Sequence, residues 1–501
     1  MSADDRSPPP PPQRNPARAL APLVPLALLV LLVIAAFHWV PGLALLGYDS
    51  YPLIAAARVQ SVADLAGLLG DELMGGRFPT GRFYRPLVHA SFALDYAISG
   101  LAPLAYHATD LAVLVANGAF VAVLTRRLFG ERPGARSALA GVLAAVLFVL
   151  HPVQVEVVPV PPRRADALCL LFLLWASIDA LGPRGGRLCG LRAGLLAWCA
   201  AASKETGVAV GLLVFALHFQ RAGAGALRAR LARAARASAA CWSGVALYLA
   251  MRTLVFGGLG GHDVSFTAGL ARMRELALPF LARVLYPQPF LADQTHAPAA
   301  ILLAGAALVV LAAALAWRPK RAPAASQGLR RGLAFLAIWC AALFAVSSLA
   351  GLVEEWYALV FVAAWAMLAG LLLAEAAQSL LAGRARLRAA LTLALVGALA
   401  LSHVRYSALF HAYDEWPRAS AAATEFLARY ESELRASPQS AFVLEGLRPR
   451  IPAPLGPGAR SVVLLHGYSL EAYAELLEPP CAVEVAVHRG RVQVTPRGAA
   501  E

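Results

Sequence analysis

The residues best suited to chemistry gather in a short polar segment between two apolar stretches. The segment HPVQVEVVPVPPRRAD, residues 151–166, contains His151, Glu156, Arg163, Arg164 and Asp166. Charged side chains are costly to bury at a membrane boundary, so they are retained there for a functional reason. The segment therefore predicts a site for a polar or charged substrate at one face of a membrane.

Other polar residues lie at the ends of apolar stretches on the same predicted side. His107, Asp110 and Asn117 are spaced by three and seven residues, so they share one stripe of a helix. We expect that stripe to face the interior of a helix bundle. The remaining polar residues on this side are Asp49, Tyr84, Arg85, Lys204, Glu205, Glu354 and Glu355.

Composition indicates a polytopic membrane protein. The chain has 501 residues, of which 59% are hydrophobic and only 15% are charged, and its mean hydropathy is +0.62. The net charge of +14 comes largely from short loops between apolar stretches, so it indicates topology and not nucleic-acid binding. The six cysteines predict no disulfide framework and no metal site.

The apolar stretches predict about eleven transmembrane helices, and the first is long enough to be retained as a span. They cover about 19–40, 104–125, 137–150, 167–181, 189–202, 206–219, 238–256, 299–317, 332–350, 357–377 and 387–403. Basic residues concentrate in alternate loops, which the positive-inside rule assigns to the cytoplasm. An odd number of spans then leaves the N-terminus in the cytoplasm and the C-terminus outside it.

Three domains are predicted from these patterns. Residues 1–17 are proline-rich and form a disordered cytoplasmic tail. Residues 18–403 form the transmembrane domain, whose loop 41–103 holds two amphipathic stretches that suit the membrane surface. Residues 404–501 form a small α+β extracytoplasmic domain. The expected elements are amphipathic helices at 61–74 and 86–99, a helix at 418–436, and strands at 440–444, 461–466, 482–487 and 491–495.

The order of short motifs resembles the GT-C membrane glycosyltransferases, and within them the transmembrane and tetratricopeptide-repeat O-mannosyltransferases and their bacterial relatives. The motifs are YRPL (Tyr84–Leu87), His107 and Asp110 with Asn117, HPxxxE (His151, Pro152, Glu156), RxD (Arg164, Asp166), SKE (Ser203–Glu205) and EWY (Glu355–Tyr357). The resemblance covers about residues 18–420. It implies an all-α polytopic fold of the GT-C type in a bacterial inner membrane.

The chain departs from this family at three points. Asp49 is followed by Ser50, where the family commonly has two adjacent acids. Asp110 stands where the family usually has Asn. Residues 421–501 contain no 34-residue repeat, so they do not predict a tetratricopeptide-repeat domain.

The resemblance implies that a sugar moves from a polyprenyl-phosphate donor to an acceptor hydroxyl of a protein, lipid or glycan on the extracytoplasmic face. Cations at the membrane boundary suit the donor phosphate, and Arg85, Arg164 and Lys204 are assigned to it. Asp49 is assigned as the base that takes the acceptor proton. One base and a phosphate leaving group suffice for direct displacement, which predicts inversion at the anomeric carbon.

Eight further residues are expected to shape the site: Tyr84, His107, Asp110, His151, Glu156, Asp166, Glu205 and Glu355. A divalent metal could bridge Asp49 and the phosphate, but no ligand spacing demands one. Two alternatives remain, a transporter or flippase for a lipid-linked glycan and a catalytically inactive membrane scaffold. The sequence shows no inverted repeat with matching broken helices, and its charges cluster at one face, which disfavours a transporter.

Overall fold

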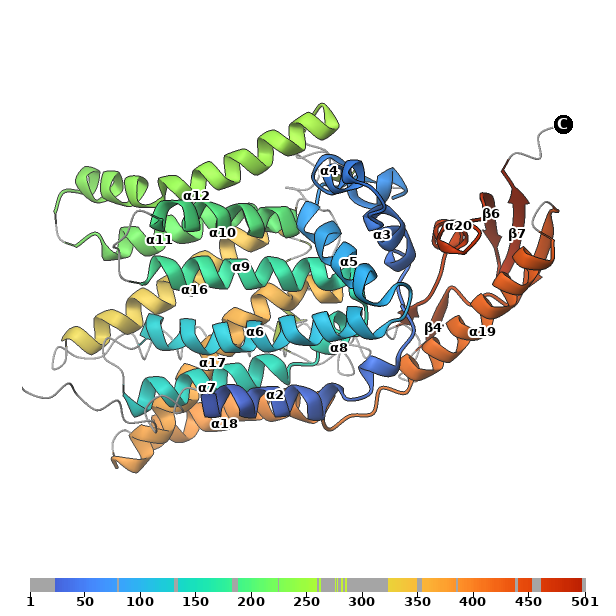
Figure 1. The fold of residues 1–501 in the computed structure, drawn as a ribbon. Helices are drawn as coiled ribbons and strands as arrows, with labels where there is room; N and C mark the ends of the chain where they lie inside the picture. The colour runs from blue at the N-terminus through green and yellow to red at the C-terminus, as the bar shows by residue number, and fades with distance from the viewer. Residues whose placement is uncertain are drawn as a thin grey trace, which may run out of the picture.

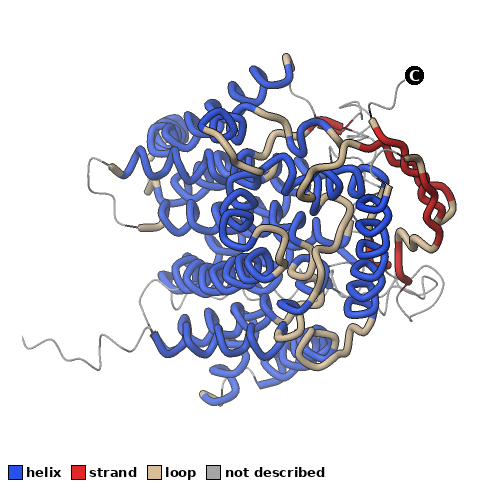
Figure 2. The backbone as a smooth tube through the Cα atoms, turned by 45° about the vertical axis from the view of Figure 1, so that its right-hand side comes forward, coloured by secondary structure: helices blue, strands red, loops and turns tan. Residues whose placement is uncertain are grey.

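A helical bundle with a smaller unit at one end makes up the computed structural model (Figure 1). The structure describes residues 23–78, 81–129, 134–182, 188–223, 225–258, 261–262, 323–348, 354–383, 386–437, 440–452 and 461–497, together with a few single positions between 275 and 285. The smaller unit follows the last helix of the bundle and contains the strands formed by residues 442–496. Figure 2 shows these strands at one side of the molecule.

The bundle helices correspond to the predicted spans. They are α2 (Leu23–Phe37), α6 (Leu104–Phe129), α7 (Ala135–Val149), α9 (Arg164–Ala180), α10 (Cys189–Ser203), α11 (Val210–Arg221), α12 (Leu227–Phe256), α16 (Pro323–Ser348), α17 (Leu359–Leu381) and α18 (Arg386–Arg405). The span predicted at 299–317 lies outside the described residues. Four stretches of helix among the described residues, at 104–129, 227–256, 328–348 and 356–381, are long and apolar enough to cross a membrane.

Burial separates a central helix from a peripheral one. The most apolar window of the stretch 356–381, which contains α17, is 83% buried, whereas that of α12 is 28% buried. Leu247 and Leu254 of α12 are exposed. A water-facing helix would rarely present such a row of large apolar side chains, so this face suits contact with lipid. The prediction of an all-α polytopic membrane fold is confirmed.

The loop after α2 folds into short helices at one end of the bundle. It contains η1 (Val40–Gly42), α3 (Ser50–Ala57), α4 (Val62–Gly70), η2 (Leu73–Gly76), the short strand β1 (Gly81–Arg82) and α5 (Pro86–Ser99), and β1 pairs with β2 (Gly261–His262). The amphipathic stretches predicted at 61–74 and 86–99 are α4 and α5. A capping box between Ser61 and Asp64 begins α4, and Pro86 occupies the first turn of α5.

The sequence placed Asp49 at the end of the first helix, and this is wrong. Helix α2 ends at Phe37, and the turn η1, which contains Pro41, redirects the chain. Asp49 instead directly precedes α3, an element that the sequence did not predict. Proline removes a backbone donor and fixes φ, so the apolar run before it does not continue as one helix.

Four short helical turns connect bundle helices near the polar residues. They are α8 (Gln154–Val157) and η3 (Pro161–Arg163) between α7 and α9, η4 (Glu205–Ala209) between α10 and α11, and η5 (Glu355–Ala358) before α17. Gly207 lets η4 lie directly on α10, because a Cβ there would stand 2.1 Å from the carbonyl oxygen of Ala200. Among them, α8 holds Glu156 of the HPxxxE motif and η4 holds Glu205 of the SKE motif.

The C-terminal unit is an α+β fold, as predicted. It contains α19 (Glu415–Ala436), β3 (Phe442–Glu445), β4 (Arg450–Pro452), β5 (Ser461–Val463), α20 (Gly467–Leu476), β6 (Val483–His488) and β7 (Arg491–Pro496). Strands β3, β7 and β6 form an antiparallel sheet in that order, and β4 pairs with β5. Helix α20 and strand β4 were not predicted. We call residues 415–497 the C-terminal domain.

Candidate functional site

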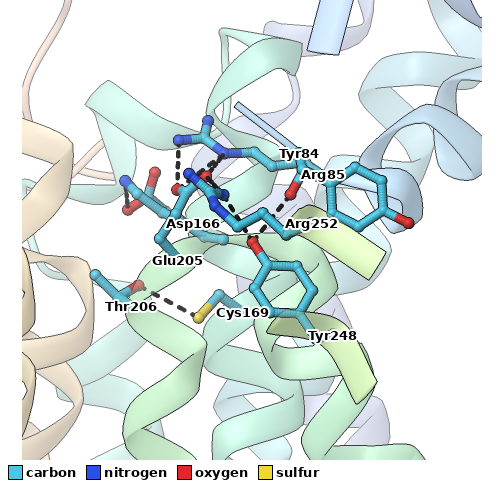
Figure 3. Close-up of polar contacts among 9 residues, drawn as sticks. Tyr84, Arg85, Asp166, Cys169, Glu205, Thr206, Tyr248 and Arg252 are labelled. Atoms are coloured by element: carbon cyan, nitrogen blue, oxygen red, sulfur yellow. Dashed lines mark hydrogen bonds and ion pairs between the residues drawn. The ribbon is translucent and has the colours of Figure 1, made fainter. Parts of the chain in front are cut away.

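Arg85 and Glu205 form the first part of a charged cluster at the end of the bundle nearest the C-terminal domain. The guanidinium of Arg85 donates from Nε (3.2 Å) and Nη2 (2.8 Å) to Oε2 of Glu205 (Figure 3). Nη1 of Arg252 donates to the other carboxylate oxygen at 3.1 Å. Burial alone would raise the pKa of the Glu205 carboxyl, but Arg85 and Arg252 outweigh it and lower that pKa to about 2. Glu205 is therefore ionised and shared by two arginines.

Tyrosine hydroxyls attach this cluster to the first loop and to α12. The hydroxyl of Tyr248 donates to the carbonyl oxygen of Tyr84 at 3.1 Å, and Arg252 donates to the Tyr248 hydroxyl at 3.0 Å. The Tyr84 hydroxyl donates to the carbonyl oxygen of Leu69 at 2.6 Å. These bonds fix the backbone that immediately precedes Arg85.

Lys204 and Asp166 form the second part of the cluster. Nζ of Lys204 lies 2.6 Å from Oδ1 of Asp166 and 4.0 Å from the centre of the Tyr357 ring. Both charged side chains are less than a tenth exposed. A carboxylate and an aromatic face thus hold the ammonium group of Lys204 at the junction of α9, α10 and η5.

Arg163 is held in a similar way by Glu156 and Trp356. Its Nη1 atom donates to Oε2 of Glu156 at 2.9 Å and to the Glu156 carbonyl oxygen at 2.5 Å. Its guanidinium carbon lies 3.7 Å from the centre of the Trp356 ring. Tryptophan and tyrosine of the EWY motif therefore each cover one cation. Glu355 begins η5, but its side chain lies outside what the structure describes.

Arg164 lies deeper, inside the bundle, where its side chain is fully buried. Nε donates to Oδ1 of Asp110 at 2.6 Å, Nη1 to Oδ2 of Asp95 at 2.5 Å, and Nη2 to the carbonyl oxygen of Tyr106 at 2.8 Å. Two carboxylates around one buried guanidinium tie α5, α6 and α9 together. Arg164 is therefore the centre of a buried ion-pair network inside the bundle.

The polar stripe of α6 faces inward, as its spacing predicted. His107, Asp110 and Asn117 are all buried. Nε2 of His107 lies 3.2 Å from the carbonyl oxygen of Leu43, in the segment that leads to Asp49. Asp110 and Asn117 line a cavity of about 10 Å³ together with Gln154 and Arg164. His107 therefore supports the first loop, and Asp110 supports Arg164.

His151 fixes the backbone of the hinge. Its Nδ1 atom accepts from the Val153 amide at 3.1 Å, and its Nε2 atom lies 3.1 Å from the carbonyl oxygen of Val284. The ring packs 4.3 Å from that of His403 in α18. The imidazole is almost completely buried. It connects three segments of the chain just after the C-terminal end of α7.

Asp49 lies at the junction of the first loop and the C-terminal domain. Its Oδ1 atom accepts a hydrogen bond of 2.9 Å from the Tyr468 hydroxyl. Burial raises the pKa of the Asp49 carboxyl, while the Tyr468 hydrogen bond and the charges of Arg85 and Arg163 act in the opposite direction. Asp49 is therefore a carboxylate with raised basicity beside two cations.

The structure brings three of the four principal residues together. Arg85 lies within electrostatic range of Asp49, Asp166 and Glu205, and Lys204 lies within range of Arg85. Arg164 is separated from this group by its burial, although the preceding residue, Arg163, acts on Asp49. The Arg85 cation and the Asp49 carboxylate thus lie within electrostatic range of each other at one end of the bundle.

Several residues of this region were not assigned roles from the sequence. Arg163, Arg252 and Asp95 complete the ion pairs, Tyr248 accepts a hydrogen bond from Arg252, and Tyr468 contacts Asp49. The adjacent basic pair at 163–164 was a usable signal for Arg163. No spacing rule could connect Tyr468 to Asp49, because 419 residues separate them.

The surroundings of Asp49 do not resemble a metal site. No group of three or more His, Cys, Asp and Glu side chains that could hold a metal ion occurs among the described residues. Asp49 has a tyrosine hydroxyl and two arginines as its polar neighbours. These groups suit an anionic ligand better than a divalent cation.

Comparison with known proteins supports the resemblance seen in the motifs. No family model matches the chain. It is similar to the human protein O-mannosyl-transferase TMTC4, with 31% identity over 137 residues that cover 25% of this chain and 18% of that protein. Mouse TMTC2 is 34% identical over 134 residues, covering 25% of this chain and 15% of that protein. The resemblance to these O-mannosyltransferases is confirmed, and the matched part spans less than a fifth of either relative.

Two solved structures align with most of this chain. The archaeal oligosaccharyltransferase AglB from Archaeoglobus fulgidus aligns over 93% of this chain and 64% of its own, with 12% identity and a TM-score of 0.45. ArnT from Cupriavidus metallidurans, solved with undecaprenyl phosphate, aligns over 96% of this chain and 99% of its own, with 13% identity and a TM-score of 0.37. About a quarter of the chain is thus similar in sequence to O-mannosyl-transferases, and four described stretches of helix are long and apolar enough to cross a membrane.

Proposed function

We propose that this protein is a membrane glycosyltransferase that moves a sugar from a polyprenyl-phosphate donor to an acceptor hydroxyl on the extracytoplasmic face, with inversion. One observation carries the proposal: Arg85 lies within electrostatic range of both Asp49 and Lys204, although the three residues are far apart in sequence. The similarity to O-mannosyl-transferases supports sugar transfer as the reaction class.

In the proposed orientation, this end of the bundle lies on the extracytoplasmic face of a bacterial inner membrane. Figure 1 shows α3, α5 and the C-terminal domain at one end of the bundle. Arg126 and Arg127 end α6, Arg221 ends α11, and Arg386 begins α18, at the opposite end. The positive-inside rule then assigns the arginine-rich end to the cytoplasm.

Arg85 and Lys204 are the proposed ligands of the donor phosphate. Arg85 uses Nε and Nη2 for Glu205, and its Nη1 atom donates to no group within the described residues. Lys204 gives one hydrogen bond to Asp166 and retains two further N–H donors. Asp166 and Glu205 hold these cations in place, so their charges are positioned before a donor arrives.

Arg164 has a different proposed role from the one first assigned to it. A side chain with no exposed surface does not contact a phosphate at the membrane boundary. Its ion pairs with Asp95 and Asp110 instead set the position of Arg163 and of the hinge. We assign Arg163 to the outer layer with Arg85, because both act electrostatically on Asp49.

The proposed reaction is a single displacement. The acceptor oxygen attacks the anomeric carbon as its proton passes to the Asp49 carboxylate. The bond from the anomeric carbon to the phosphate oxygen breaks, and polyprenyl phosphate leaves with the electron pair beside Arg85 and Lys204. Attack opposite the leaving group inverts the anomeric carbon. A base of raised pKa is better suited to this transfer than an exposed aspartate.

The test is sugar transfer by the purified full-length protein from a panel of radiolabelled polyprenyl-phosphate sugars. Release by the wild type that falls by about 10²- to 10⁴-fold in Asp49→Asn would support the proposal. Asp71→Asn is the matched control, because Asp71 is an exposed aspartate in the same loop. Turnover by Asp49→Asn equal to the wild type would overturn the role of the base. No turnover by a folded wild type would favour a transporter or an inactive scaffold.

A further inference from the structure

The C-terminal domain contributes a side chain directly to the proposed active site. The Tyr468 hydroxyl, in the first turn of α20, donates to Oδ1 of Asp49 at 2.9 Å. In the part of the chain that the structure describes, this is the only hydrogen bond to the Asp49 carboxylate. A carboxylate oxygen pair can accept about four hydrogen bonds, so the tyrosine leaves room for a second donor.

Contacts on both sides of Asp49 hold α20 in this position. Before it, the Gly47 amide donates to the carbonyl oxygen of Val463 at 3.2 Å, and the Ser469 hydroxyl donates to that of Tyr48 at 2.6 Å. After it, the ring of Tyr51 packs edge-on against that of Tyr473 at 5.0 Å. The geometry of the Tyr468 hydroxyl is therefore set by backbone and ring contacts independent of the carboxylate itself.

These contacts lie close to the cations as well. Arg85 and Arg163, from the first loop and the hinge, act on Asp49 from the bundle, while Tyr468 approaches it from the C-terminal domain. A flexible carboxylate between two guanidinium groups would rotate toward them and form an ion pair. The tyrosine hydroxyl offers the carboxylate a competing neutral donor, which fixes one oxygen and leaves the other for a substrate hydroxyl.

We propose that Tyr468 is a positioning residue that orients Asp49 for the acceptor hydroxyl, so that the C-terminal domain forms part of the acceptor site. This inference rests on the proposed function. It gives the domain a role in the transfer step, whatever the acceptor is. It also accounts for a tyrosine that reaches Asp49 of the first loop from the first turn of α20, although the preceding Gly467 packs against β6.

The test compares Tyr468→Phe with Tyr473→Phe in the full-length protein. Both changes remove one hydroxyl from the same helix, but the Tyr473 hydroxyl donates to Glu431 at 2.8 Å. We expect Tyr468→Phe to lower kcat about tenfold and to leave KM for the lipid-linked sugar unchanged. Tyr473→Phe should match the wild type in kcat. Thermal unfolding of both variants in detergent checks that they are folded.

A second readout separates positioning from simple packing. The Tyr468 hydrogen bond favours the ionised carboxylate, so its loss should move the acid limb of the kcat profile to higher pH. A folded Tyr468→Phe variant with the kcat and acid limb of the wild type would overturn the inference. So would a lower KM for the acceptor at undiminished kcat, because Tyr468 would then merely occupy the acceptor position.

The two proposals fail in different ways. If the wild type transfers no sugar from any lipid-linked donor, the proposed function fails and this inference falls with it. If the wild type and Tyr473→Phe transfer sugar and Tyr468→Phe does so with unaltered kcat and pH profile, only the inference fails. Restored kcat in Tyr468→Gln, whose amide can also donate to Asp49, would support positioning by hydrogen bonding.

Discussion

Lys204 and Asp166 share a hydrogen bond of 2.6 Å, although one residue follows α10 and the other lies in the first turn of α9. Each side chain is less than a tenth exposed, so neither charge is solvated by bulk water. Removing one partner of such a pair leaves the other charge buried and uncompensated. The pair therefore permits a test that separates stability from donor binding.

The single variant Lys204→Met should be both unstable and inactive. Loss of the ammonium leaves Asp166 unpaired, and we expect destabilisation of about 3–5 kcal/mol. The double variant Lys204→Met with Asp166→Leu should recover most of this stability, because neither charge of the pair then remains without its partner. It should still lose at least about 100-fold in kcat/KM for the donor, if Lys204 binds the phosphate. Thermal unfolding and donor kinetics measure the two effects, and an active double variant would contradict the assignment.

Arg164→Met should affect folding more than substrate affinity. The variant leaves Asp95 and Asp110 without their shared buried partner, at an expected cost of about 3–5 kcal/mol. The control is Arg192→Met, which breaks a half-exposed ion pair with Asp179 and should cost about 0–1 kcal/mol. Arg164→Met protein of wild-type thermal stability but raised donor KM would instead favour direct phosphate binding.

Asp49→Asn should be more stable than the wild type at neutral pH. Burial raises the pKa of the Asp49 carboxyl above its ordinary value of 3.8. The folded state therefore binds this proton more tightly than the unfolded state, and the wild type loses stability as pH rises through the raised pKa. The amide carries no charge and avoids this loss. Unfolding temperatures measured from pH 4 to pH 8 should diverge in favour of the variant as pH rises. Equal temperatures at all pH values would contradict the raised pKa.

The same shift governs the activity profile of the wild type. A base must be ionised to accept the proton, so activity should fall as pH drops through the pKa of Asp49. This acid limb should lie above the pH at which an exposed aspartate titrates. A profile of kcat/KM against pH, measured with saturating detergent-solubilised acceptor, tests the position of the limb. Activity that is constant down to pH 4 would exclude Asp49 as the base.

Gly47→Ala should distort the segment that carries Asp49. Gly47 has a φ of +96°, and a Cβ there would stand 2.8 Å from Cγ1 of Val160. We expect destabilisation of about 1–3 kcal/mol and a lower kcat, because the neighbouring carboxylate would shift. Gly42→Ala is the control in the same loop, since its Cβ would meet no atom within 4 Å. Equal effects of the two substitutions would show that the close approach to Val160 is unimportant.

The sequence predicted most of the bundle, because long apolar runs and basic loops are strong local signals. Helices α4 and α5 were also predicted, from their amphipathic character. Helix α3 was missed, because its eight residues are apolar, contain Pro52 and carry no helical periodicity. Helix α20 was missed because it is short and lies between two stretches, 461–466 and 482–487, that were predicted as strands.

Only part of the proposed site could be predicted from the sequence. Residue types at the ends of spans pointed to Arg85, Lys204 and Asp49 as neighbours. The same reasoning could not order Arg163 and Arg164, because adjacent residues of a short turn point in different directions and only packing decides which is buried. Contacts across the whole chain, such as that between Gly47 and Val463, have no local signature.

The backbone contact between Gly47 and Val463 also bears on how the protein is made. Synthesis and membrane insertion proceed from the N-terminus, so the segment around Asp49 leaves the ribosome long before its partners in β5 and α20. Until those partners have been synthesised, the loop lacks the packing that fixes its carboxylate. If the proposed function is right, a prematurely terminated chain would bring the bundle and its cations to the membrane without a finished active site, and only molecules that contain α20 would transfer sugar.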